Sequence, residues 1–207
     1  MTKLKLCGLA RICDIEAANR LNPEYIGFVF AKKSRRYVDP AQARKLRARL
    51  NKGISPVGVF VNESPEAIAD LVRSGIIDVV QLHGSEDEAF LRKLRELASC
   101  PIIKAFSVKT PQGVRIACES SADLILLDSG GGGTGMVFDW NLLEPIRRPW
   151  FLAGGLSPEN AADAIRRLAP YGVDVSSGIE TDGVKDRQKM NDFVRAVRGA
   201  GGKEVVK

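Results

Sequence analysis

One cysteine and one aspartate stand at the ends of apolar runs, where they could act on a substrate. Cys7 closes the run LKLC and Asp128 closes the run DLILLD. A thiolate can remove a proton from carbon, and a carboxyl in apolar surroundings can stay protonated and donate one. Cys7 is therefore the candidate general base and Asp128 the candidate general acid. The simpler interpretations are that Cys7 is an inert buried side chain and that Asp128 caps a loop. As a base, Cys7 needs a pKa below the free value of about 8.5, which a nearby cation or helix N-terminus would give.

Two segments rich in glycine and serine could bind a phosphate group. The first, AGGLS, contains Gly154 and Gly155, and the second, SSGIE, begins with Ser176, Ser177 and Gly178. Glycines allow backbone N–H groups to approach an anion, and serine hydroxyls add donors. Either segment alone would be interpreted as a tight turn. Because they follow consecutive apolar runs, the two together favour a phosphate site.

Three further polar side chains could hold other parts of a substrate. Arg36, in the basic stretch AKKSRRYV, could form a bidentate contact with a carboxylate. Arg35 is a second candidate for that role, and the alternative is that both arginines belong to a solvated basic loop. Gln81 and His83 are two positions apart in VVQLHG, so they share one face of a strand. They could line a substrate pocket, or His83 could orient a loop through a hydrogen bond.

The composition argues against metals, nucleic acids and membranes. The four cysteines form no CxxC pair and the chain has a single histidine, so we expect no metal site and interpret Cys13, Cys100 and Cys118 as filler. The net charge is +6, but few aromatic residues accompany the basic clusters, which favours a small anionic substrate over nucleic acid. The sequence shows neither a long uncharged apolar run nor a signal-peptide pattern, so we expect a cytoplasmic protein with no membrane partner.

Short apolar runs alternate with helix signals along the chain. The runs lie at 4–7, 25–30, 56–61, 78–83, 102–106, 123–128, 150–154 and 173–177. Helix starts include Asp39-Pro40, Ser64-Pro65 and Ser157-Pro158, the last of which predicts a helix from residue 158. The alternation predicts a single-domain (β/α)₈ TIM barrel, an α/β fold, over residues 1–198, with residues 199–207 as a flexible tail. A doubly wound open sheet is the alternative, but GLAR after the first run is no GxGxxG turn.

In such a barrel the active site lies at the carboxyl ends of the strands, where these polar residues fall. The alternation of side chains also places Lys5 on the same face as Cys7, pointing into the barrel. A buried lysine needs a partner, and Asp174 on the neighbouring last strand has the same parity as Ser176. We therefore predict a Lys5–Asp174 pair beneath the site. The glycine-rich stretch 130–135 predicts a mobile loop that could act as a lid.

The chain carries seven motifs in a fixed order. They are KLCGL (5–9), IGFVFAKKSRRYV (26–38), VGVFVN (57–62), VVQLHG (79–84), LLDSGGGGTGMVFDW (126–140), LAGGLSPEN (152–160) and VDVSSGIE (173–180). In this combination the chain resembles the phosphoribosylanthranilate isomerase family, whereas other phosphosugar barrels share mainly the phosphate-binding end. The resemblance implies an aldose–ketose isomerase of tryptophan biosynthesis that needs no metal or cofactor.

The resemblance also implies a mechanism. Asp128 would protonate the furanose ring oxygen of N-(5-phosphoribosyl)anthranilate, and Cys7 would remove the proton from the sugar C2, giving 1-(o-carboxyphenylamino)-1-deoxyribulose 5-phosphate. Arg36 would hold the anthranilate carboxylate. The alternatives are a broader isomerase that also accepts the histidine-pathway aminoaldose phosphate, a non-catalytic phosphometabolite-binding barrel, and a nucleic-acid-binding protein. We expect a monomer, since no apolar helix face stands out for a partner.

Overall fold

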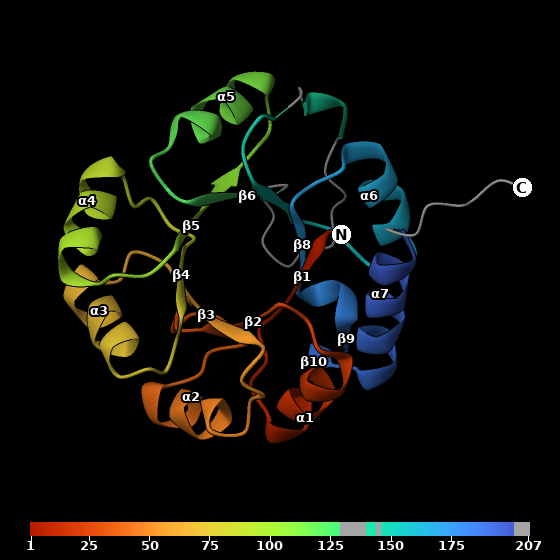
Figure 1. The fold of residues 1–207 in the computed structure, drawn as a ribbon, viewed down its shortest axis with the longest axis horizontal. Coiled ribbons are helices and arrows are strands. Elements are labelled where there is room, and N and C mark those ends of the chain that lie inside the picture. The colour runs from red at the N-terminus through yellow and green to blue at the C-terminus, as the bar shows by residue number, and fades with distance from the viewer. Residues whose placement is uncertain (129–139, 144–145, 201–207) are drawn as a thin grey trace, which may run out of the picture.

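The computed structural model describes residues 1–128, 140–143 and 146–200 of the chain. Eight parallel strands close into a barrel, and helices surround it (Figure 1). In chain order the strands are β1 (Lys3–Cys7), β2 (Tyr25–Val29), β3 (Ser55–Phe60), β4 (Val79–Leu82), β5 (Ile102–Ser107), β6 (Leu124–Asp128), β7 (Trp150–Leu152) and β8 (Gly172–Val175). Each strand pairs with the next, and β8 pairs with β1. The prediction of a (β/α)₈ barrel is confirmed, and the open doubly wound sheet is wrong.

The described helices follow the predicted alternation. They are α1 (Ile12–Leu21), α2 (Pro40–Arg47), α3 (Pro65–Arg73), α4 (Glu88–Leu97), α5 (Pro111–Glu119), α6 (Ala161–Leu168) and α7 (Arg187–Ala200). The Asp39 and Ser64 side chains cap α2 and α3 and are each followed by a proline at the helix start, as the sequence predicts. Between β6 and β7, Trp140–Leu142 forms a 3₁₀ turn. The predicted lid at 130–135 lies outside the described residues.

Two helix boundaries differ from the sequence-based expectation. Helix α6 begins at Ala161 rather than at residue 158. The reason is Asn160, whose side-chain oxygen accepts from the Ser157 N–H at 2.9 Å and whose amide donates to the Gly155 oxygen at 2.8 Å. These bonds keep the preceding residues in a loop. At the other end, α7 continues to Ala200, two residues beyond the predicted domain boundary at 198.

A small ribbon follows β8 and has no counterpart in the predicted elements. The strands β9 (Glu180–Thr181) and β10 (Val184–Lys185) pair antiparallel. They are joined by Asp182 and Gly183, which both have positive φ, +54° and +78°. Asp-Gly is a residue pair that such two-residue hairpin turns favour, so this dipeptide was the signal available in the sequence.

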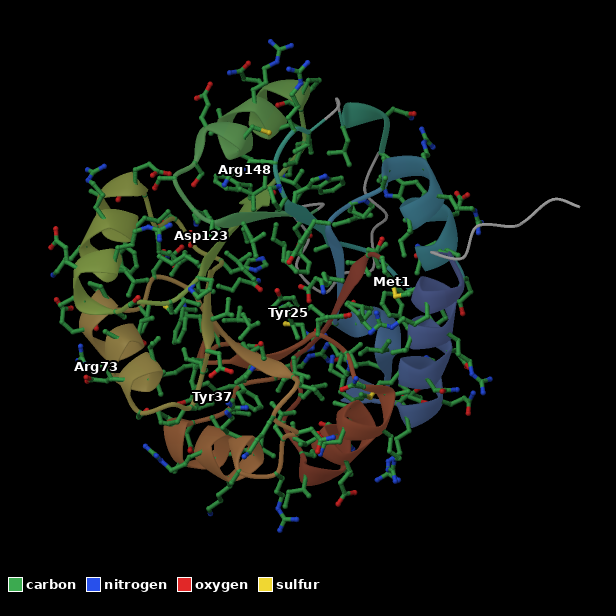
Figure 2. All side chains as sticks on the ribbon, viewed as in Figure 1. Met1, Tyr25, Tyr37, Arg73, Asp123 and Arg148 are labelled. Carbon is green, nitrogen blue, oxygen red and sulfur yellow. The ribbon has the colours of Figure 1, made fainter. Side chains whose placement is uncertain are left out.

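The amino-terminal end of the barrel is filled by aromatic rings. Phe151 contacts Tyr25 and Tyr171 edge-on, each with a ring-centroid distance of 5.7 Å. Tyr25 lies near the centre of the ring of strands in Figure 2. Apolar side chains of β3 to β7 pack around these rings inside the barrel. The space that a substrate could enter is therefore at the opposite end, where the strands finish.

One charged pair is buried inside the barrel. The Lys5 ammonium is fully buried and donates to Asp174 Oδ1 at 2.8 Å, across the β1–β8 pairing. The flanking residues Leu4 and Leu6 belong to the core between strands and helices, so the side chains alternate as the sequence predicts. Burial would lower the pKa of Lys5, but Asp174 and Cys7 together outweigh that effect and raise it. The predicted Lys5–Asp174 pair is confirmed.

Breaking this pair on one side is expected to destabilise the protein strongly. Lys5→Met leaves a buried carboxylate without its cation, and we expect a loss of about 3–5 kcal/mol in the free energy of unfolding. Urea unfolding followed by circular dichroism measures the change. Lys93→Met is the control, since Lys93 and Glu66 form an exposed pair and its loss should cost less than about 1 kcal/mol. Equal losses in the two variants would contradict a buried charge pair.

Candidate active site

A cavity of about 210 Å³ lies at the carboxyl ends of the barrel strands. Its described lining comprises Cys7, Val29, Ala31, Ser34, Arg36, Val59, Val61, Gln81, His83, Asp128, Ala153, Gly154, Gly155, Leu156, Asp174, Val175, Ser176 and Ser177. All of the predicted site residues except Gly178 line it. Gly178 has a structural role, because a Cβ there would overlap the backbone of Leu156. One cavity therefore brings together the thiol, the carboxyl, the arginine and both glycine-containing loops.

Cys7 ends β1 and points into this cavity, where β2 makes room for it. A Cβ on Gly27 would lie 2.7 Å from the Cys7 sulfur, so a larger residue on β2 would displace the thiol. Burial raises the pKa of the Cys7 thiol above its ordinary value, and the Lys5 ammonium opposes this rise without reversing it. The sequence-based condition that this pKa falls below the free value is therefore not met. The cation that the sequence argument required is present, but desolvation is the larger effect.

Asp128, His83 and Gln81 form a chain of polar contacts between β4 and β6, which are separated by β5 in the barrel. Gln81 Nε2 and His83 Nδ1 are 2.9 Å apart, and His83 Nε2 lies 3.7 Å from Asp128 Oδ2. Burial lowers the pKa of His83, which favours the neutral imidazole. With the Gln81 amide donating to Nδ1, the imidazole carries its proton on Nε2, directed at Asp128. His83 thus contacts the candidate acid and does not serve only to orient a loop.

Gln81 also presents an unused acceptor. Its side-chain oxygen is buried and has no hydrogen-bond partner among the described residues. A buried polar atom without a partner is costly, and a bound molecule that donates to it would remove that cost. Because Gln81 lines the cavity, this oxygen fits a substrate hydroxyl or N–H group.

Arg36 reaches the cavity in a fixed orientation. Its Nε and Nη2 donate to the two carboxylate oxygens of Glu180 at 2.6 and 2.7 Å. Glu180 also accepts from Lys185 Nζ at 2.6 Å, and the same ammonium donates to the Ser176 backbone oxygen at 2.8 Å. Sequence reasoning missed Glu180 and Lys185, because both lie on the unpredicted ribbon.

The two glycine-containing loops have the backbone shape that their residues predict. Gly154 and Gly155 both adopt positive φ, +83° and +66°, which other residues rarely do. Asn160 braces this loop through its bond to the Gly155 oxygen. In the second loop, the Ser176 hydroxyl donates to the Cys7 backbone oxygen at 3.2 Å, so the loop also touches the end of β1. The tight turns are therefore present, and they lie on the cavity wall.

Neither a metal cluster nor a membrane helix is found in the part of the chain that the structure describes. No group of three or more His, Cys, Asp or Glu side chains among residues 1–128, 140–143 and 146–200 could hold a metal ion. None of the described helices combines the length and apolar character that crossing a bilayer requires.

A closed parallel barrel with this set of groups at its carboxyl rim fits the class of aldose–ketose isomerases, and the family match assigns the chain to that class. Comparison with known proteins gives the family. The family described as N-(5'phosphoribosyl)anthranilate (PRA) isomerase matches residues 4–196. The N-(5'-phosphoribosyl)anthranilate isomerase of Endomicrobium trichonymphae is 43% identical, over 96% of this chain and 99% of its own. The chain therefore belongs to the PRA isomerase family of tryptophan biosynthesis, as its motifs predict.

Solved structures agree with this assignment. Phosphoribosyl anthranilate isomerase from Thermotoga maritima is 38% identical with a TM-score of 0.87, covering 96% of this chain and 100% of that one. That protein is described as dimeric. A phosphoribosyl anthranilate isomerase in complex with reduced 1-(o-carboxyphenylamino)-1-deoxyribulose 5-phosphate is 37% identical, with a TM-score of 0.85 and coverage of 96% and 100%.

The burial of Cys7 has a measurable consequence for its reactivity. We expect its alkylation by iodoacetamide to rise with pH along a curve whose midpoint lies above the ordinary thiol value of about 8.5, because burial disfavours the thiolate. Mass spectrometry of the peptide containing Cys7 measures the rate. The control is the same cysteine in the unfolded protein, where the midpoint should return to about 8.5. A folded-state midpoint at or below that value would contradict the effect of burial.

Proposed function

We propose that this protein converts N-(5'-phosphoribosyl)anthranilate to 1-(o-carboxyphenylamino)-1-deoxyribulose 5-phosphate by acid–base catalysis, without a metal or cofactor. The observation that carries the proposal is the cavity wall itself, on which Cys7 and Asp128 lie together with Arg36 and two glycine-containing loops. A binding protein would need the loops and the arginine but not the two proton-transfer groups. The ligand-bound relative, which holds a reduced form of this product, supports the same substrate class.

In the proposed mechanism, Asp128 donates a proton to the furanose ring oxygen. The C1–O bond breaks and the nitrogen lone pair forms a C1=N bond, which gives an open-chain iminium ion. The Cys7 thiolate then removes the proton from C2, and the electrons of that C–H bond form an enolamine. The enolamine then tautomerises: its hydroxyl loses a proton and C1 gains one, so that C2 becomes a ketone and C1 becomes the CH2 group of a secondary amine.

Several groups favour these proton transfers. The Lys5 and Lys185 ammonium groups stabilise the thiolate of Cys7 and oppose the effect of burial. His83 Nε2 faces the Asp128 carboxyl at 3.7 Å and would stabilise its negative charge after proton donation. The unpaired oxygen of Gln81 is available to a sugar hydroxyl. Thus each half of the reaction has a polar group beside the side chain that carries it out.

The two ends of the substrate would be held by different parts of the rim. We assign the carboxylate of the anthranilate ring to Arg36. We assign the phosphate to the backbone N–H groups and hydroxyls around Gly154, Gly155, Ser176, Ser177 and Gly178. Val29, Val59 and Val61 line the same cavity and offer an apolar surface to the aromatic ring. The related aminoaldose phosphate lacks the anthranilate carboxylate, so the Arg36 contact favours phosphoribosylanthranilate.

The proposed setting is a cytoplasmic monomer that binds neither nucleic acid nor a membrane. The large apolar side chains exposed among the described residues are Met1, Ile12, Val61, Ile116, Tyr171 and Val184. They come from different elements and do not form one helix face, which supports the monomer.

The catalytic roles are tested by two substitutions that change little but the proton-transfer group. Cys7→Ser and Asp128→Asn should each lower kcat for phosphoribosylanthranilate by about 10²-fold or more, since each removes a general acid or base. The fluorescence of the substrate follows its consumption. Cys118→Ser, at a cysteine outside the cavity, is the control and should retain wild-type turnover. Near-normal turnover by Asp128→Asn would overturn the assignment of the acid.

The oligomeric state is tested by size-exclusion chromatography with light scattering. We expect the mass of one chain, 22.5 kDa, at micromolar concentration. A mass of twice that value would contradict the proposed monomer and would place this protein with the dimeric Thermotoga maritima enzyme.

A further inference from the structure

We propose that Glu180, presented by the β9–β10 ribbon, is a positioning residue that fixes the guanidinium of Arg36 and thereby sets the affinity for the carboxylate of the substrate. This inference rests on the proposed function, because it assigns the substrate carboxylate to Arg36. It adds a residue on a separate element to the binding of that group.

The contact between Arg36 and Glu180 is strong and largely withdrawn from water. Both hydrogen bonds are short, 2.6 and 2.7 Å, and the Glu180 side chain is only 6% exposed while that of Arg36 is 17% exposed. Bidentate pairs of this kind fix the plane of the guanidinium as well as its position. Burial alone would raise the pKa of Glu180, but the bonds from Arg36 and Lys185 outweigh it and keep that pKa below its ordinary value. Glu180 is therefore a carboxylate at neutral pH.

The bonding pattern leaves one edge of the guanidinium for a ligand. Glu180 occupies the edge formed by Nε and Nη2, and the edge formed by Nη1 and the second Nη2 hydrogen is a further pair of donors in the same plane. The Arg36 side chain has no other hydrogen-bond partner in the described ranges, and it lines the cavity. A second carboxylate can therefore bind Arg36 side by side with Glu180.

The arginine side chain is also held against the loop that follows Cys7. Gly8 has φ of +79°, and a Cβ on it would lie 2.5 Å from Arg36 Cδ and 3.3 Å from the Ser176 hydroxyl. The aliphatic part of Arg36 thus runs directly over Gly8. The side chain is fixed at its middle by Gly8 and at its head by Glu180, so few rotamers remain to be lost when a ligand binds.

The ribbon that carries Glu180 is itself anchored at several points. Lys185 pairs with Glu180 in the ribbon register, and its ammonium donates to Glu180 and to both the carbonyl and the hydroxyl oxygen of Ser176. The Lys185 carbonyl accepts from Arg11 Nη2 at 2.7 Å. The Asp186 N–H donates to the Ile179 oxygen at 2.9 Å. Glu180 is therefore a fixed point and not a mobile surface acid.

Charge also argues for a role in binding. Arg36 and Lys185 carry two positive charges around the single negative charge of Glu180, which leaves one positive charge for an anion. Removing the Glu180 charge would place two cations close together and free the guanidinium to rotate. We expect that loss of orientation to weaken carboxylate binding although the net positive charge of the site increases, which a purely electrostatic account would not predict.

The test compares Glu180→Gln with the wild-type protein in turnover of the substrate and in binding of two ligands, one with the carboxylate and one without it. We expect KM for phosphoribosylanthranilate to rise roughly tenfold or more, with kcat changed by less than about threefold, because binding and not proton transfer is affected. Calorimetry should show a matching loss of affinity for reduced 1-(o-carboxyphenylamino)-1-deoxyribulose 5-phosphate. In the same calorimetric measurement, the affinity for inorganic phosphate, which has no carboxylate, should change by less than about twofold. Equal weakening of both ligands, or no weakening of either, would overturn the proposal.

A double-mutant cycle shows whether Glu180 acts through Arg36. Arg36→Ala alone should raise KM, and adding Glu180→Gln to it should change KM no further, because the positioned group is already gone. Additive effects would show that Glu180 does not act through Arg36. Glu180→Asp keeps the charge but withdraws the carboxylate by one methylene, and we expect an intermediate KM; it also serves if Glu180→Gln fails to fold.

Two controls separate this inference from general destabilisation and from the proposed function. Glu86→Gln breaks another buried pair, in which Lys104 donates to Glu86 at 2.9 Å outside the cavity. It should lower stability without changing the ratio of the two ligand affinities. If the wild-type protein fails to turn over phosphoribosylanthranilate, the proposed function fails, whereas the calorimetric comparison of the two ligands still decides the role of Glu180.

Discussion

Placing a charged lysine inside a closed barrel constrains the whole structure. The Lys5 side chain is fully buried and needs a charged partner, and that partner comes from a strand that is adjacent only when the barrel is closed. Asp174 on β8 meets that requirement. The pair fixes the register between the first and last strands, and with it the height at which Cys7 and Ser176 reach the rim. The Ser176 loop, to which we assign the phosphate, and the candidate base are thus aligned by a contact that neither of them makes.

The same constraint shapes the chemistry of the thiol. Burial makes the Cys7 thiolate unfavourable, while the Lys5 and Lys185 ammonium groups make it less unfavourable than burial alone would. In the proposed mechanism, a thiolate of high proton affinity is a strong base once it is ionised. The site therefore combines a weakly ionised thiol with a set of charges that allow ionisation, in place of a thiol that is always ionised.

Much of the fold and part of the site could be predicted from the sequence, and the division has physical causes. Apolar runs and proline-flanked caps are local signals, and they gave the strand order, most helix starts and the inward direction of Lys5. Glu180, Lys185 and Asn160 act through contacts with residues distant in the sequence or through loop geometry. The local periodicity of apolar residues does not indicate such contacts. The Asp-Gly dipeptide at 182–183 predicts a hairpin, but the neighbouring sequence does not indicate that the first strand of this hairpin contacts Arg36. The direction in which the pKa of Cys7 departs from its ordinary value also depends on packing, which residue types and their spacing in the sequence do not reveal.

The separation of Lys5 and Asp174 in the chain has a consequence for synthesis. The two residues are 169 positions apart, so the earliest strand is made long before the residue that neutralises it. At about 5–20 residues per second, a ribosome needs roughly 10–30 s to cover that distance. Until then Lys5 must remain hydrated, and β1 cannot take its final place in a dry interior. Closure of the barrel is thus postponed to the last part of translation. Until then an incomplete chain has an open sheet edge, which can pair with strands of other chains.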